Sequence, residues 1–349
     1  MDYFYLNFKT KTSEFCKYPQ ESFINLGTLK WKTNDFQHNI QICLSEEFKN
    51  INSQQIDLPF NNHFNKYHLH ILRSQLQKSV RRQKKFISLK TCLTMALIED
   101  ESKQKFKQIG LFEMLRRITI IIIEDSVLIF EYNILVWFLC ALSKGFYLNK
   151  YFLKWILEIL WKVFSSLFKD TFFKFYKLEN LSKKKLINDI NEDYLLREHK
   201  DLLLSIQLRT SFFGMKGDIT MIDKSTLIWC ERIKNDSYHK NYLKIDYIDY
   251  PVKLECLSKT EIELESLDFH CTNIINKIIE YFPMDKILLK KLIWKYSSSL
   301  NYKIDITTKL NFIKSNLKQK KVLEWSLIEN IVYIEQMKIK QELIINEKF

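Results

Sequence analysis

Four carboxylates and one histidine in this sequence form a set that could hold a divalent metal ion. Glu124 and Asp125 follow a run of apolar residues, and Asp218, Asp268 and His270 lie further along the chain. Carboxylate and imidazole groups of this kind bind the metal ions of metal-dependent nucleases. This set supports one hypothesis for the protein, a metal-dependent phosphodiester hydrolase that uses a carboxylate cluster.

A structural role explains the first two carboxylates equally well. Arg116 and Arg117 precede the apolar run that Glu124 and Asp125 follow, and buried acids pair with nearby arginines more often than they bind a metal. The block LRRITIIIIEDS (115–126) is also similar to part of the helical C-terminal region of clamp-loader-related ATPases. The nucleotide-binding motifs of those ATPases are absent from this sequence, so the similarity implies no activity.

Other features of the sequence argue against a cofactor. His270 and Cys271 are adjacent, so on a helix they diverge by about 100° and cannot act as a nucleophile and its base. Zinc ligands at paired spacing are absent, and only five glycines occur in the chain. Glycine-rich loops that cradle phosphates are therefore excluded as well. We expect no catalytic residue, no metal ion and no cofactor.

The stretch 59–98 is rich in basic residues and contains no acidic residue. Apolar residues recur in it every three or four positions, at Leu69, Leu72, Leu76 and Val80, which predicts a helix with one face docked on a core. Basic side chains on the other faces could neutralise several phosphates of a nucleic acid. The predicted contact residues are Arg73, Lys78, Arg81, Arg82, Lys84 and Lys85. The alternative is a solvated face that balances acidic residues elsewhere in the chain.

The overall charge agrees with such a partner. The formal net charge is +13 and the isoelectric point is about 9.2, which favours polyanions. We therefore expect a non-catalytic nucleic-acid-associated protein that binds the phosphate backbone through a basic helix. A third hypothesis is a structural subunit of a large intracellular or organellar assembly, in which residues 126–168 would contact protein partners or a bilayer.

The most apolar stretch, residues 111–168, must position these groups. A membrane-spanning helix needs about 20 mostly apolar residues, but residues 126–143 contain Glu131 and Asn133. In residues 151–168, Lys154, Glu158 and Lys162 recur every four residues and share one face of a helix. The stretch therefore predicts a buried helical centre and not a membrane anchor, and we expect residues 195–208 and 273–282 to pack against it.

These patterns predict a mainly α protein: a multi-helix globular core with a small β-containing N-terminal portion. We expect three parts, namely a small β or irregular portion at 1–60, a basic helix and apolar helical core at 61–180, and a helical region at 181–349. Seven widely spaced cysteines without a CxxC pair, and no secretory leader at the N-terminus, indicate a reducing intracellular compartment, such as the nucleus, the cytoplasm or an organelle.

Overall fold

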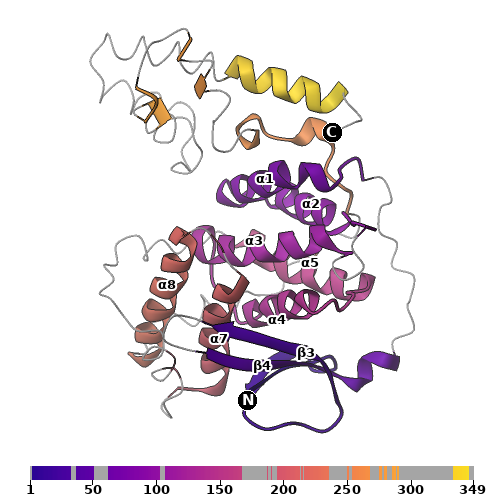
Figure 1. Cartoon of the computed structure of the whole chain (residues 1–349), viewed down its shortest axis with the longest axis vertical. Helices are drawn as coiled ribbons and strands as arrows, with labels where there is room; N and C mark the ends of the chain where they lie inside the picture. Colours follow the sequence, from indigo (N-terminus) through magenta and orange to yellow (C-terminus); the bar gives the residue numbers. More distant parts are fainter. Residues whose placement is uncertain are drawn as a thin grey trace.

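The computed structural model describes most of the chain. The described residues are 2–32, 37–50, 62–102, 107–166, 187, 190, 195–212, 214, 216–235, 250, 254–267, 275–276, 279–280, 285–287, 289–290 and 333–345. They form a mainly α-helical protein with one small sheet built from N-terminal residues (Figure 1). The fold class predicted from the sequence is confirmed.

Four N-terminal strands form the sheet. They are β1 (Asp2–Asn7), β2 (Thr12–Cys16), β3 (Phe23–Lys32) and β4 (Gln37–Ser45), in the spatial order β2-β1-β4-β3. β1 and β2 are antiparallel, as are β3 and β4, while β1 and β4 run parallel in the middle. Alternate side chains of the two central strands, such as Phe4, Leu6 and Ile42, are fully buried.

The sheet packs on α4 (Tyr132–Ser143), a deeply buried helix. Ten of its 12 residues are buried, as expected for a helix that is apolar on all sides. The indole Nε1 of Trp137 donates to the backbone oxygens of Phe4 and Cys43, at 3.0 and 3.2 Å. Because these two acceptors lie on β1 and β4, this side chain fixes α4 against the centre of the sheet.

Helices are layered on the side of α4 away from the sheet (Figure 1). α3 (Ile109–Asp125) and α5 (Lys150–Ser165) come next, and α1 (Leu69–Arg81) and α2 (Lys85–Ala96) form the layer beyond them. α7 (Arg197–Leu208) packs on α4 and on α8 (Lys216–Lys234). The prediction that residues 195–208 pack on the apolar centre is thus confirmed, whereas 273–282 lies mostly outside the described residues.

The apolar stretch 111–168 is divided between α3, α4 and α5. α5 begins at Asn149, whose side chain accepts hydrogen bonds from the backbone N–H groups of Tyr151 and Phe152. Of the helices that the structure describes, none is both long enough and apolar enough to cross a membrane. The cysteines among the described residues are free thiols, and the compartment stays a prediction. The predicted division near residues 60 and 180 falls on stretches outside the description (51–61 and 167–186).

The basic stretch forms two helices where the sequence predicts one. α1 ends at Arg81, and α2 begins at Lys85 after a turn of three residues. Gln83 in this turn has φ 58°, a left-handed conformation that only a few per cent of non-glycine residues adopt. The turn places α1 and α2 side by side, so the cations of the turn lie at one end of this helical layer (Figure 1).

Candidate nucleic-acid interface

Three of the six predicted contact residues hold the fold together. Lys78 and Arg81 are each only 4% exposed. Arg73 lies nearer the surface, and its Nη1 donates to Glu113 Oε2 on α3 at 2.9 Å. The structure therefore does not leave all six residues open to a phosphate, because Lys78 and Arg81 are buried and Arg73 and Arg81 pair with carboxylates of α3.

Arg81 forms a bidentate pair with Asp125 at the end of α3. Its Nε and Nη2 donate to the two carboxylate oxygens at 2.8 and 2.6 Å, and Nη2 also lies 3.2 Å from Glu124 Oε1. Burial alone would lower the pKa of the guanidinium, but the hydrogen bond and charge of Asp125 raise the pKa above its ordinary value. Since both side chains of the pair are almost fully buried, Arg81 cannot reach a phosphate.

The neighbouring carboxylate, Glu124, joins the same polar network. It accepts from Gln77 Nε2 at 3.0 Å, and Gln77 accepts in turn from Arg117. Burial raises the pKa of Glu124, and the charge of Asp125 raises it further, while Arg81 and Arg117 act in the opposite direction. As expected, these two acids pair with an arginine. The arginine that contacts them directly is Arg81 on α1, and not Arg116 or Arg117.

The carboxylates considered for metal binding are only partly brought together. Asp218 lies in the first turn of α8 and is close enough to raise the pKa of Glu124. Asp268 and His270 lie outside the described residues. Within the part of the chain that the structure describes, no group of three or more His, Cys, Asp and Glu side chains is arranged to hold a metal ion.

The remaining predicted cations gather at the turn between α1 and α2, together with an exposed ring. We call residues Arg82, Gln83, Lys84, Lys85 and Phe86 the turn surface. Lys84 has 48% of its side chain exposed, and the Phe86 ring is 52% exposed. The ammonium group of Lys85 lies 5.4 Å from the centre of this ring and 5.0 Å from the centre of the Trp161 ring. No carboxylate among the described residues pairs with Lys85.

The start of α2 adds partial positive charge to the turn surface. Lys84 occupies the N-cap position, and its side chain makes no capping hydrogen bond. The first backbone N–H groups of a helix have no partner within the helix, and they attract anions. Lysine side chains and helical N–H groups therefore act in the same direction here.

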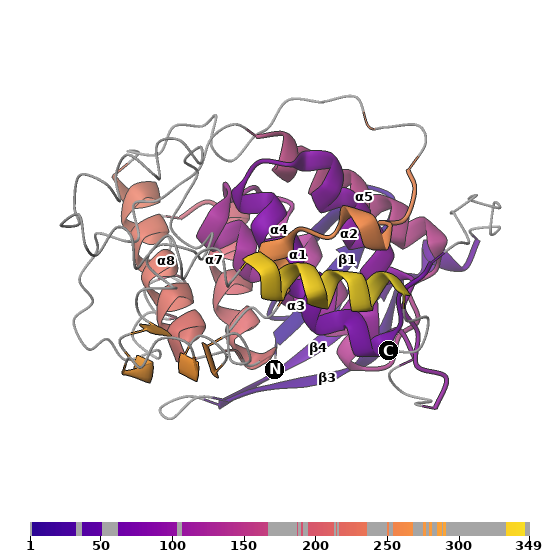
Figure 2. The ribbon, with the colours of Figure 1, turned by 90° about the horizontal axis from the view of Figure 1, so that it is seen from above.

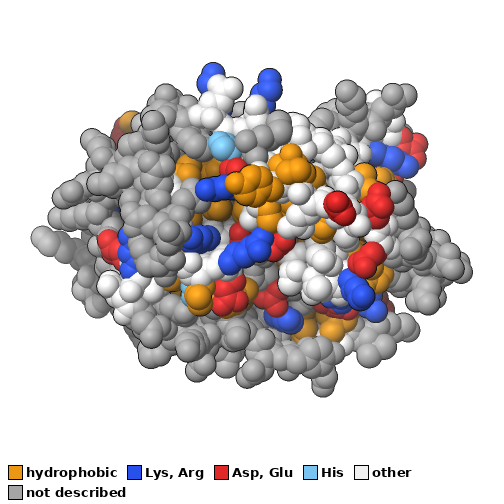
Figure 3. All heavy atoms as spheres, turned by 90° about the horizontal axis from the view of Figure 1, so that it is seen from below, with side chains coloured by type: hydrophobic (Ala, Val, Ile, Leu, Met, Phe, Trp, Pro, Cys, Tyr) orange, Lys and Arg blue, Asp and Glu red, His pale blue; other side chains and the backbone are white. Residues whose placement is uncertain are grey.

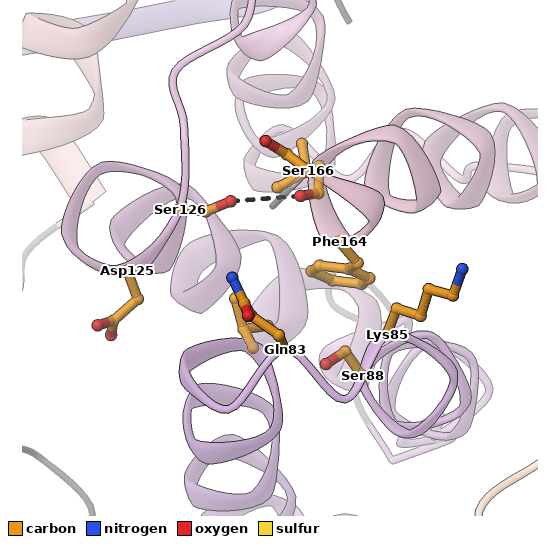
Figure 4. A pocket seen from close by; sticks show the side chains of 9 residues that line it. Gln83, Lys85, Ser88, Asp125, Ser126, Phe164 and Ser166 are labelled. Atoms are coloured by element: carbon orange, nitrogen blue, oxygen red, sulfur yellow. Dashed lines mark hydrogen bonds between the residues drawn. The ribbon is translucent and has the colours of Figure 1, made fainter. Parts of the chain in front are cut away.

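A small pocket lies beside the turn surface, where α1 and α2 approach the ends of α3 and α5 (Figure 4). Gln83, Ser88 and Ser126 line it, and Ser126 Oγ donates to the backbone oxygen of Val163 at 3.3 Å. Lys85 and Asp125 point away from each other on opposite sides of the pocket (Figure 4). The Lys85 ammonium thus lies against the Phe86 and Trp161 rings, while Asp125 pairs with Arg81.

A segment far along the chain covers part of the same layer. Residues 254–267, which we call the strap, lie across α1 and α2, with the helix at 333–345 above them (Figure 2). The backbone N–H of Glu263 and the hydroxyl of Ser266 both donate to Gln75 Oε1 on α1, at 2.9 and 2.7 Å. Leu257, Ile262 and Leu267 are fully buried, so the strap backbone is firmly anchored.

Two strap carboxylates lie on cations of this layer. Glu263 pairs with Arg82 and, at 2.8 Å, with the Nζ of Lys84. Glu261 Oε1 lies 2.9 Å from Lys90 Nζ on α2. Sequence reasoning missed the contact between the strap carboxylates and the cations of α1 and α2. The signal in the sequence was the opposite charge of two stretches, the acid-free stretch at 59–98 and the glutamate-rich stretch at 261–265. Such a pattern does not say which residues meet.

The opposite end of the molecule has a different character. Seen from below, where the sheet lies, basic and acidic side chains are intermingled around a group of hydrophobic side chains (Figure 3). A face with both charges intermingled does not favour binding of a polyanion. Comparisons with protein-family models, with curated proteins and with solved structures find no match for this chain, so the candidate interface is judged on its own chemistry.

Proposed function

We propose that this chain is a non-catalytic protein that binds nucleic acid through the turn surface. The observation that carries the proposal is the exposed Phe86 ring beside Lys85, a cation for which the described residues supply no carboxylate. Lys84 and the uncapped start of α2 lie next to it. This is a smaller contact set than the basic helix that the sequence predicts.

The combination of groups favours a single strand over a duplex. Bases of a single strand can stack on aromatic rings, and each such contact contributes about 1–3 kcal/mol with little dependence on sequence. The lysines and the N–H groups at the start of α2 would contact the phosphates on either side of a stacked base. A duplex keeps its bases inside and would use only the phosphate contacts, so we expect it to bind more weakly.

The charges elsewhere in the layer limit the contact set. Arg73, Lys78 and Arg81 are buried or face carboxylates of α3, and a phosphate would have to break those pairs to use them. Arg82 and Lys84 both pair with Glu263, whose side chain is 10% exposed. Lys84 is the more exposed of the two cations, at 48%, and ion pairs of exposed side chains contribute only about 0–1 kcal/mol each, so a polyanion can compete for Lys84.

Fluorescence anisotropy with a labelled oligothymidylate tests the proposal. We expect affinity to fall steeply with added salt, and the variant K84E/K85E to bind at least about tenfold more weakly at low salt, because each lost phosphate contact lowers the salt slope by about 0.7 on a single strand. A duplex of the same length should bind more weakly than the single strand.

K30E/K32E is the matched control, since it makes the same change in net charge on β3, at the opposite end of the molecule (Figure 1). At about 0.15 M salt, where the Debye length is about 8 Å and nonspecific attraction at a distance is screened, its affinity should stay within about twofold of the unaltered protein. Equal losses in the two variants would mean that net charge, and not the turn surface, attracts the oligonucleotide. Unchanged binding by K84E/K85E would overturn the proposal.

A further inference from the structure

The two strap glutamates differ in what holds their carboxylates. Glu261 Oε2 accepts the backbone N–H of Ser258 at 2.8 Å, which closes a capping box, in addition to the Lys90 pair. The contacts of the Glu263 carboxylate within the described region are with Arg82 and Lys84 of the turn surface. Glu261 therefore stabilises the strap itself, whereas Glu263 acts on the turn surface.

The position of Glu263 is that of a bound phosphate group. Its two oxygens face two different cations, one guanidinium and one ammonium, which are the usual donors to a nucleic-acid phosphate. The backbone beside it is fixed by the hydrogen bond from Glu263 N to Gln75 and by the buried side chain of Ile262. A carboxylate on an anchored backbone has a high effective concentration at its target.

We infer that Glu263 is a built-in competitor that lowers the affinity of the turn surface for phosphates; this inference rests on the proposed function. Binding of a strand requires that the Glu263 carboxylate, which is 10% exposed, moves away from Lys84. The strap backbone keeps its buried anchors Leu257 and Leu267 during this exchange. Lys85 and Phe86 make the first contacts, and Lys84 becomes available when the carboxylate is displaced.

Neutralising the carboxylate without changing its shape tests the inference. We expect E263Q to bind the labelled oligothymidylate up to about fivefold more tightly at low salt, since the pair with Lys84 no longer has to be broken. The salt slope should increase in magnitude by up to roughly 0.7, because one more cation then contacts a phosphate of a single strand.

E99Q is the matched control. Glu99 pairs with Lys107 and accepts from Tyr147, just beyond the far end of α2, so the same loss of one negative charge there should leave the affinity within about twofold. Circular dichroism and urea unfolding of both variants show that the strap is still folded. If E263Q binds no more tightly than E99Q while K84E/K85E loses binding, the inference is overturned and the proposed function stands. If no variant binds at any salt concentration, both are overturned.

Discussion

Arg81 and Arg82 are neighbours in the sequence, yet they belong to two regions with different physics. Arg81 is 4% exposed and meets Asp125, which is 2% exposed, in the α1–α3 interface. Arg82 has 24% of its side chain exposed and meets Glu263 of the strap. A rotation of about 100° per residue on a helix directs one side chain inward and the next towards the surface.

The two regions differ in what their charges can do. In the Arg81–Asp125 pair of the α1–α3 interface, both charges have given up almost all of their hydration, so each partner is indispensable and no outside ligand can replace it. At the turn surface Arg82 and Lys84 remain partly hydrated, and both pair with Glu263 of the strap. A high positive charge in the sequence therefore does not measure how much charge is available for binding.

The largest expected effect tests the buried region. Arg81→Met keeps much of the side-chain volume but leaves Asp125 buried without its guanidinium, and we expect the free energy of unfolding to fall by about 3–5 kcal/mol. Urea unfolding followed by circular dichroism measures it. The double variant R81M/D125L should recover a large part of the loss, since it removes the uncompensated charge. If the double variant were as unstable as R81M, the loss of stability could not be attributed to the unpaired charge of Asp125.

A second buried acid, Asp201, can be compared with Asp125. Its carboxylate accepts from a backbone N–H, whereas Asp125 accepts from a bidentate arginine. Asp201 on α7 accepts the N–H of Phe15 on edge strand β2 at 3.0 Å. Burial raises the pKa of Asp201 from its ordinary value of 3.8 to about 7, although the Phe15 hydrogen bond lowers it. A buried carboxyl with this partner thus holds its proton to a higher pH in the folded chain than in the unfolded chain.

This shift predicts how stability depends on pH. Because the folded pKa is the higher one, the contribution of Asp201 is complete below about pH 3.8 and is lost as the pH rises to about 7. We expect the loss to be at most a few kcal/mol. Asp201→Asn cannot ionise but can still accept from Phe15, so its stability should change less between pH 4 and pH 8 in urea titrations. Identical pH profiles for both proteins would rule out Asp201 as the source.

The elements of the fold could be predicted from the sequence, since they follow from local periodicity. The alternation around Tyr3 and Tyr5 marks β1, and the spacing of Leu69, Leu72 and Leu76 marks α1. The end of α1 could not be predicted in this way. The turn of Arg82, Gln83 and Lys84 contains neither glycine nor proline, so the sequence contains no local signal for the left-handed conformation of Gln83.

The partners of the charged side chains were harder to predict, because they are separated by long stretches of chain. Arg81 meets an acid 44 residues away, and Arg82 meets Glu263, 181 residues away. Helix geometry could have improved one expectation. Arg116 and Asp125 are nine residues apart on α3, which is roughly 13 Å along the helix axis, so they cannot pair directly. The acid at the end of α3 had to find its arginine on another helix.

The smallest expected effect tests the surface region with a change one residue away from the largest. Arg82→Gln removes one of the two cations that face Glu263, and Lys84 remains at 2.8 Å to hold the carboxylate. We expect urea unfolding to show a loss below about 1 kcal/mol, as is usual for ion pairs near the surface. If R82Q lost as much stability as R81M, Glu263 would be as dependent on its partner as Asp125 is. The turn surface would then be a structural contact like the α1–α3 interface, and its cations would have no share in binding an outside phosphate.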